Sequence, residues 1–220
     1  MKFQKGSIFK PEKEYYKFAG ILLVVACVQY LLAVNVAESL YPGYSIAVNS
    51  LSDLGGSLPL VEPAAIIFNV SNIILGILIL ITVYLILKSG GCRLFSSCLA
   101  VFGFCIVALG IFPEYAGGIH VTFALLAFIS GILALFFSYR LGINIPMIII
   151  SMILGLIALI TFISPFIYGI GSANPLNVFG MGGAERLIVY PIILYLTALG
   201  GYLTSRGKDW VRIRFTEGYW

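Results

Sequence analysis

The apolar residues of this chain gather into six long runs, and most polar residues fall between the runs. The runs cover approximately residues 17–37, 64–87, 94–112, 119–139, 146–168 and 185–204. Each is close to the length of about 20 residues that a helix needs to cross the apolar part of a bilayer. The pattern therefore predicts an all-α fold, a polytopic membrane bundle of six transmembrane helices.

The composition supports that interpretation and excludes other classes of protein. Of the 220 residues, 60% are apolar and 10% are charged. An ordinary soluble domain is about 25% charged. The composition excludes a soluble enzyme, a disordered chain and a nucleic-acid-binding domain. The first apolar run is longer than the core of a cleaved secretory signal, so we expect it to be a retained anchor.

The basic residues predict the orientation of the bundle. If the N-terminus is cytoplasmic, all 13 Lys and Arg residues except Arg186 lie on the cytoplasmic side. Lys and Arg accumulate in cytoplasmic segments, so both termini are expected there, in a multi-pass protein of the cell membrane. We expect a cytoplasmic interfacial N-terminus at 1–16, the transmembrane domain at 17–204, and a cytoplasmic basic and aromatic tail at 205–220.

Small residues within the runs predict close helix packing. Gly103 and Gly110 in the third run can let another backbone approach closely.

The sequence gives two reasons to expect no transport function. The two halves of the chain show no inverted repeat, which makes an alternating-access transporter less expected. The cytoplasmic halves of the third to fifth runs are almost wholly apolar, which disfavours a channel.

Polar residues concentrate at the predicted outer ends of the runs. Ionisable groups near membrane depth usually face a cavity or one another, so the concentration predicts an outward-facing polar pocket. Two glycine-containing segments, 50–57 and 180–184, are expected to be non-helical and to cover the opening of this pocket. The residues concerned are Ser52, Asp53, Asn69, Asn72, Glu114, His120, Glu185 and Arg186.

Each candidate has a chemical role and a structural alternative. His120 is the best candidate for a base or ligand, because a histidine changes charge near neutral pH, although it can also act as a capping residue. Asp53 and Glu185 can assist it as catalytic acids, yet Asp53 can form a turn and Glu185 can stabilise the first turn of a helix.

The other candidates are assigned to ligand binding. Arg186 is the one basic residue placed against the orientation rule, and its partner is expected to be Asp53, Glu114, Glu38 or a lipid phosphate. Ser52 is a further candidate for the binding site. Asn69 and Asn72 share one face of the second run, where they either line the pocket or bond to another helix.

The order of these residues resembles a known family. Ser52-Asp53-Leu54-Gly55 precedes the second run, Phe68-Asn69 lies within it, and Phe112-Pro113 ends the third. His120 begins the fourth run, and Gly183-Ala184-Glu185-Arg186 opens the sixth. This order is similar to the bacterial and archaeal membrane proteins of domain-of-unknown-function family 998, over about residues 18–204.

The resemblance implies a site without implying an activity. It makes Ser52, Asp53, Asn69, Pro113, His120, Glu185 and Arg186 the signature positions, and the family carries no agreed activity. The first outer connection, with Leu58-Pro59-Leu60-Val61-Glu62, departs from the family pattern, which leaves the opening of the pocket and its ligand preference open.

Two functions remain in competition at the level of sequence. The favoured one is a non-catalytic membrane protein whose pocket binds a lipid or a partner membrane protein. The alternative is an outer-leaflet enzyme that acts on a lipid or lipid-linked substrate by acid–base or metal-assisted hydrolysis, with His120, Asp53, Glu185 and Arg186. No cofactor is required by the sequence. A divalent metal held by Asp53, His120 and Glu185 is a further possibility, and no nucleic-acid partner is expected.

Overall fold

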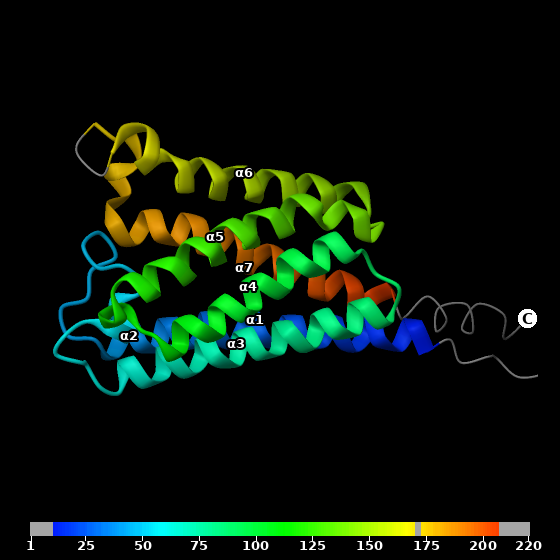
Figure 1. The fold of residues 1–220 in the computed structure, drawn as a ribbon, viewed down its shortest axis with the longest axis horizontal. Helices are drawn as coiled ribbons and strands as arrows, with labels where there is room; N and C mark the ends of the chain where they lie inside the picture. The colour runs from blue at the N-terminus through cyan, green and yellow to red at the C-terminus, as the bar shows by residue number, and fades with distance from the viewer. Residues whose placement is uncertain (1–10, 170–172, 207–220) are drawn as a thin grey trace, which may run out of the picture.

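A computed structural model describes residues 11–169 and 173–206 of the chain. Six long helices run along a common axis, alternating in direction (Figure 1). They are α1 (Pro11–Leu40), α3 (Ala64–Lys88), α4 (Arg93–Ile111), α5 (Gly118–Phe137), α6 (Ile145–Tyr168) and α7 (Gly180–Arg206). All six are long and apolar enough to span a membrane. The predicted all-α bundle of six transmembrane helices is confirmed, and the chain is a multi-pass membrane protein.

Short elements lie in the connections. The helix α2 (Asp53–Gly56) is part of the long connection between α1 and α3. The single-turn 3-10 helices are η1 (Glu114–Ala116), η2 (Ser138–Leu141) and η3 (Pro175–Phe179). The expectation of a non-helical segment was wrong at 180–184, and at 50–57 it holds only outside residues 53–56. Residues 53–56 and 180–184 are helical, because glycine weakens a helix without preventing its hydrogen bonding.

The division of the chain into regions is only partly covered by the described residues. The spanning region predicted at 17–204 corresponds to α1 through α7. The predicted interfacial N-terminus at 1–16 falls largely outside the described residues, as does the predicted tail at 205–220.

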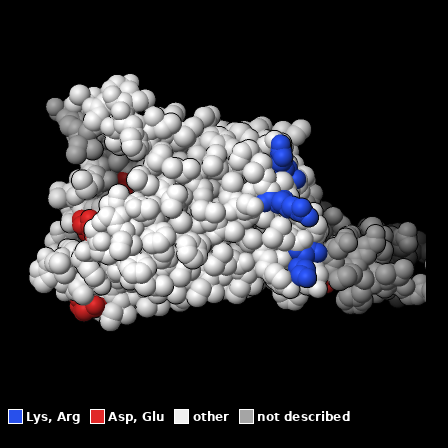
Figure 2. All heavy atoms as spheres, viewed as in Figure 1, with Lys and Arg blue, Asp and Glu red and all other residues white. Residues whose placement is uncertain are grey.

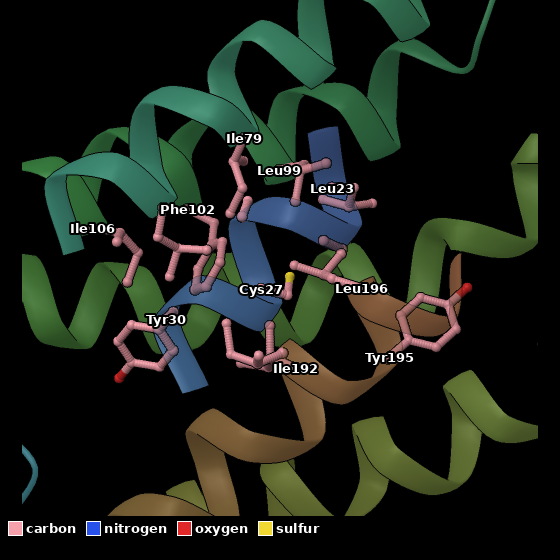
Figure 3. Packing of buried hydrophobic residues seen from close by; sticks show 14 of the residues in the cluster. Leu23, Cys27, Tyr30, Ile79, Leu99, Phe102, Ile106, Ile192, Tyr195 and Leu196 are labelled. Atoms are coloured by element: carbon pink, nitrogen blue, oxygen red, sulfur yellow. The ribbon is translucent and has the colours of Figure 1, made fainter. Parts of the chain in front are cut away.

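The core of the bundle forms around α1. This helix packs against α3 on one side and α7 on the other, α4 packs against α3, and α5 against α4. Leu23, Cys27 and Tyr30 of α1 point into the space between α3, α4 and α7, where they meet Phe102 and Ile192 (Figure 3). In contrast, α6 lies at the edge of the bundle and packs mainly on α7 (Figure 1).

Glycine allows two pairs of helices to approach closely, and one of the two contacts involves Gly103, which the sequence predicted to permit it. A Cβ atom added at Gly200 of α7 would lie 2.8 Å from the carbonyl oxygen of Gly20 on α1. Gly76 of α3 and Gly103 of α4 face each other in the same way. Such contacts matter in a membrane because lipid chains are as apolar as leucine, so van der Waals packing holds helices together.

The two ends of the bundle carry opposite charges. Lys88 ends α3, Arg93 begins α4 and Arg140 lies in η2, so all three belong to the end where α1 begins and α7 finishes. We call this the basic end. The other end, where α1 finishes and α7 begins, we call the polar end. On the face drawn in Figure 2, Lys and Arg gather at the basic end, and Asp and Glu lie mainly at the polar end.

Candidate functional site

The connection after α1 folds back onto the polar end through a turn built around Asp53. One carboxylate oxygen, Oδ2, accepts hydrogen bonds from the backbone N–H of Ser50 at 2.9 Å and from the side chain of Asn49 at 3.1 Å. The backbone N–H of Asp53 in turn donates to Ser50 Oγ at 3.0 Å. Asp53 therefore shapes the turn that begins α2, and its neighbour Ser52 is presented to the bundle.

Ser52 contacts two of the other candidate residues, Glu185 and His120. Its Oγ donates to Glu185 Oε1 at 3.2 Å and lies 3.1 Å from Nε2 of His120. The other carboxylate oxygen of Glu185 accepts the backbone N–H of Leu51 at 2.6 Å. The structure thus brings together side chains from the first connection, from α5 and from α7, which the sequence separates by up to 133 residues.

The orientation of the His120 ring is fixed by a carbonyl group. Nδ1 lies 2.9 Å from the carbonyl oxygen of Phe112, at the end of α4. A carbonyl only accepts, so Nδ1 carries a hydrogen and Nε2 is the atom that gives or takes a proton at Ser52. His120 is buried, and it is therefore held in one orientation against the serine hydroxyl.

Arg186 makes contacts with different residues from those of Glu185, although it follows Glu185 in the chain. Its guanidinium forms an ion pair with Glu38 of α1 and donates to the hydroxyl of Tyr44 at 2.8 Å. It also donates to the carbonyl of Gly182 at 3.0 Å. Glu38 was one of the four predicted partners. Because both charged side chains are largely removed from solvent, this group locks α1, the first connection and α7 together; we call it the arginine clamp.

The two asparagines of α3 line a cavity. Asn69 Nδ2 donates to the carbonyl of Gly55 in α2 at 2.9 Å, and Asn72 Nδ2 donates to the carbonyl of Phe68 at 3.2 Å. Both residues face the same cavity as Ser52. Of the two predicted roles, lining the cavity applies to both, and a bond to another helix applies to Asn69.

This first cavity is small and largely apolar. Its volume is about 40 Å³, which is room for two or three waters at roughly 15 Å³ each. The lining combines the polar groups of Ser52, Asn69, Asn72, His120 and Glu185 with aromatic and aliphatic side chains that include Tyr30, Phe68, Phe102, Phe128 and Ile192. Several of the latter belong to the core in Figure 3. Asp53 and Arg186 are not among its lining residues.

A second, larger cavity adjoins the first. It has a volume of about 220 Å³ and lies between α5, α6, η3 and α7. Glu185 and Phe128 line both cavities. Exposed residues on its rim, such as Pro165 and Met181, belong to membrane-spanning segments. The larger cavity is therefore lined in part by exposed residues, and Glu185, whose carboxylate bonds to Ser52, is among its lining residues.

Glu114 of η1 lies beside the turn of Asp53. Burial first, then hydrogen bonding to Asp53 and the negative charges of Asp53 and Glu185, raise the pKa of Glu114 to about 7. Two neighbouring carboxyl groups favour holding one proton between them. The raised pKa of Glu114 therefore predicts that the contact between α2 and η1 responds to pH near neutrality.

One family matches the chain over most of its length. The family, described as protein of unknown function (DUF998), matches residues 24–202. This chain is a member of the DUF998 family. The resemblance predicted from the order of short motifs is thereby confirmed, within the limits predicted for it. No curated protein and no solved structure matches the chain.

The structure also bears on the metal alternative in this DUF998 protein. Within residues 11–169 and 173–206, no group of three or more His, Cys, Asp or Glu side chains is arranged so that it could hold a metal ion. Asp53 accepts hydrogen bonds from Asn49 and Ser50, whereas Glu185 accepts them from Leu51 and Ser52, so the two carboxylates serve different groups of the turn.

Sequence reasoning missed several residues of the DUF998 site. Thr161 and Ser164 of α6 and Asn174 before η3 line the larger cavity. The signal for the first two was available, since they stand three residues apart in an otherwise apolar helix and so share one face. The role of the Phe112 carbonyl had no signal in the sequence, because a backbone contact depends on how two helix ends meet.

Proposed function

We propose that this DUF998 protein binds a single membrane lipid, with an acyl chain in the larger cavity and the polar part of the lipid beside Glu185. The main observation that supports this proposal is the lining of the larger cavity. Its walls combine apolar side chains such as Phe128, Leu176 and Ile188 with the polar side chains of Thr161, Ser164 and Asn174. A mixed lining suits an amphipathic ligand that enters from the membrane.

The position of α6 supports this entry route. Asn174 donates to Ser164 Oγ at 3.3 Å and to the carbonyl of Gly169 at 3.2 Å, so the connection after α6 is fastened to that helix. Below it, α6 packs less extensively on α5 than on α7. The larger cavity lies in the space between these three helices, and its exposed lining residues Pro165 and Met181 mark the side from which we propose that a lipid chain enters.

The orientation proposed with this function follows the distribution of basic residues. Lys88, Arg93 and Arg140 are exposed at the basic end, which supports a cytoplasmic location for that end and for both termini. The polar end then faces outward in the cell membrane, and the bound lipid belongs to the outer leaflet.

A binding role needs no reaction, and a non-catalytic lipid-binding protein is the simplest form of this proposal. The enzyme alternative is favoured by one observation, the contact of 3.1 Å between Ser52 Oγ and His120 Nε2. A serine and a histidine in such contact are the elements of a nucleophile with its base.

The lipid-binding proposal is tested by filling the larger cavity. Ala184 lines it, whereas Ala198 lies exposed on the same helix. Ala184→Trp should abolish retention of one lipid per protein in native mass spectrometry after extraction into mild detergent, and Ala198→Trp should retain it. Equal lipid occupancy in the two variants, or none in the unmodified protein, would overturn the proposal.

A further inference from the structure

We propose that Ser52 and His120 cleave a carboxylic ester of the lipid, with Ser52 as nucleophile and His120 as general base. This inference rests on the proposed lipid binding and adds a reaction to it. The substrate class is an acyl ester whose chain occupies the larger cavity and whose carbonyl group reaches the smaller one.

The geometry of the pair is that of an activated nucleophile. Ser52 Oγ lies 3.1 Å from His120 Nε2, and the opposite ring nitrogen lies 2.9 Å from the Phe112 carbonyl oxygen. A nucleophile in contact with a base, and a base oriented by a third group, are the arrangement on which covalent catalysis depends. The Phe112 carbonyl is the orienting group, since it keeps the hydrogen on Nδ1 and leaves Nε2 facing the serine.

Glu185 acts as a positioning residue. Its Oε2 is held by the Leu51 N–H at 2.6 Å, and its Oε1 accepts the Ser52 hydroxyl at 3.2 Å. Ser52 carries a single hydrogen, so it donates either to Glu185 or to His120. Turning that hydrogen from the carboxylate to Nε2 prepares the serine oxygen for attack, while Glu185, which shares Ser52 with His120, contributes negative charge that favours the imidazolium.

The smaller cavity suits the reacting carbonyl group. It joins Ser52 and His120 to apolar walls that exclude most water, which strengthens electrostatic contacts inside. Asn72 lines the same cavity and uses one N–H of its amide for the Phe68 carbonyl. The second N–H of that amide is the donor we assign to the developing oxyanion.

The reaction proceeds in two balanced steps. In the first, the Ser52 oxygen bonds to the ester carbon and its proton moves to His120 Nε2. The bond from that carbon to the alkoxy oxygen breaks, and His120 returns the proton to the departing alcohol. In the second, a water attacks the acylated Ser52, His120 takes the proton from the water, and the carboxylic acid leaves as the proton returns to the serine.

The experiment uses hexadecyl and ethyl fluorophosphonates, which phosphonylate an activated serine. The purified full chain is incubated with each probe, and intact-mass and peptide mass spectrometry measure the rate and site of labelling. We expect one adduct, on Ser52, with His120→Gln slowing labelling at least about a hundredfold, the lower range for general-base catalysis. Ser57→Ala is the matched control, because Ser57 lies in the same connection and bonds to Tyr41, and it should label like the unmodified protein.

Further variants separate a chemical role from a structural one. Ser52→Ala should lose labelling, and Ser52→Cys should instead be alkylated by hexadecyl iodoacetamide at a rate that falls when His120→Gln is added. Glu185→Gln should slow phosphonylation and alter its pH profile; a lower melting temperature with an unchanged profile would make Glu185 structural only.

Two results distinguish failure of the inference from failure of lipid binding. Ser52 labelling no faster than Ser57 labelling with either probe, or unaffected by His120→Gln, would overturn the inference even if lipid is retained. If Ser52 is labelled but Ala184→Trp slows the hexadecyl and ethyl probes equally, the nucleophile stands and the assignment of the acyl chain to the larger cavity is wrong. If Ala184→Trp slows labelling by the hexadecyl probe but not by the ethyl probe, the result supports both the nucleophile and the place of the acyl chain.

Discussion

The two ends of the bundle use charged side chains in opposite ways. At the polar end, Arg186 pairs with Glu38, and Glu185 bonds to Ser52, so the charged groups bind other groups of the protein. At the basic end, Lys88 and Arg140 are exposed, and their cationic groups lie over the rings of neighbouring tyrosines at 5.5 and 5.8 Å. Charge at the basic end is available to water and lipid headgroups.

The difference separates charges that are paired inside the protein from charges that are exposed at its surface. A buried ion pair is costly to form, and removing one member leaves the other unpaired in a poorly solvated place. An exposed cation gains little from any single protein contact and is easily replaced. The same residue types should therefore differ strongly in their effect on stability, according to the end at which they stand.

The arginine clamp offers the strongest test of this contrast. Arg186→Met leaves the Glu38 carboxylate without its partner, and we expect it to lower the free energy of unfolding by about 3 to 5 kcal/mol. Arg140→Met, at an exposed position of the basic end, is the control. Thermal or denaturant unfolding in mild detergent measures both.

The double variant Arg186→Met with Glu38→Gln refines the same test. Because it removes both charges, it should be more stable than Arg186→Met alone. A single variant at Arg186 as stable as Arg140→Met would mean that the clamp does not hold the polar end together.

A second test asks whether close packing of α1 against α7, rather than charge, stabilises the part of the bundle toward the basic end. Gly200→Ala places a methyl group against the backbone of α1 at Gly20, and overpacking of this kind costs about 1 to 3 kcal/mol. Gly201→Ala meets nothing within 4 Å and should raise stability by up to about 1 kcal/mol, because alanine is the better helix former. Equal melting temperatures for the two variants would remove close helix approach as the cause.

A third test uses pH, to which the polar end should respond. Folding raises the pKa of Glu114 from 4.5 to about 7, so the folded state holds the proton more tightly than the unfolded one. The stabilisation is complete below pH 4.5 and is lost as the pH rises through 7. Because the side chain is only partly buried, we expect the melting temperature to fall by about 2 to 4 °C between pH 5 and 8. Glu114→Gln should remove this slope, and an unchanged slope in that variant would assign it to other groups.

The smallest expected change in stability concerns the basic end itself. Replacing Lys88, Arg93 and Arg140 together by Gln should alter the free energy of unfolding by less than about 0.5 kcal/mol per position. Because Lys and Arg favour the cytoplasmic side of a membrane, the same variant should increase the fraction of chains inserted in the opposite orientation, as judged by accessibility of a C-terminal tag in intact cells. A uniform orientation together with a large loss of stability would reverse the contrast between the ends.

The spans were predictable from the sequence, whereas the partners of the polar residues were not. A helix such as α3 is defined by an unbroken apolar run, and its observed limits at Ala64 and Lys88 differ little from the predicted 64–87. The residues at the polar end were found because polar groups are rare near membrane depth. Which of them touch was not predictable, because Glu185 and Arg186 are neighbours in the chain yet bond to different partners, Ser52 in one case and Glu38 in the other.

The larger cavity shows a further limit of sequence reasoning. Asn174 and Ser164 belong to a connection and a helix that the apolar pattern treats separately, and their contact exists only because α6 and α7 are joined through η3. A cavity is defined by what the packing leaves unfilled, and a linear pattern of apolar positions does not encode unfilled space.

The contact between Ser52 and Glu185 has a consequence for biosynthesis. The serine is translated early and the carboxylate only with the last helix, so the site is incomplete while the ribosome is still adding α3 to α6. A nascent chain that stops before α7 contains Ser52 and His120 but lacks the carboxylate and the arginine that fasten the first connection. Maturation of the site is thus tied to the final insertion event, and a prematurely terminated chain in the membrane would lack the assembled site.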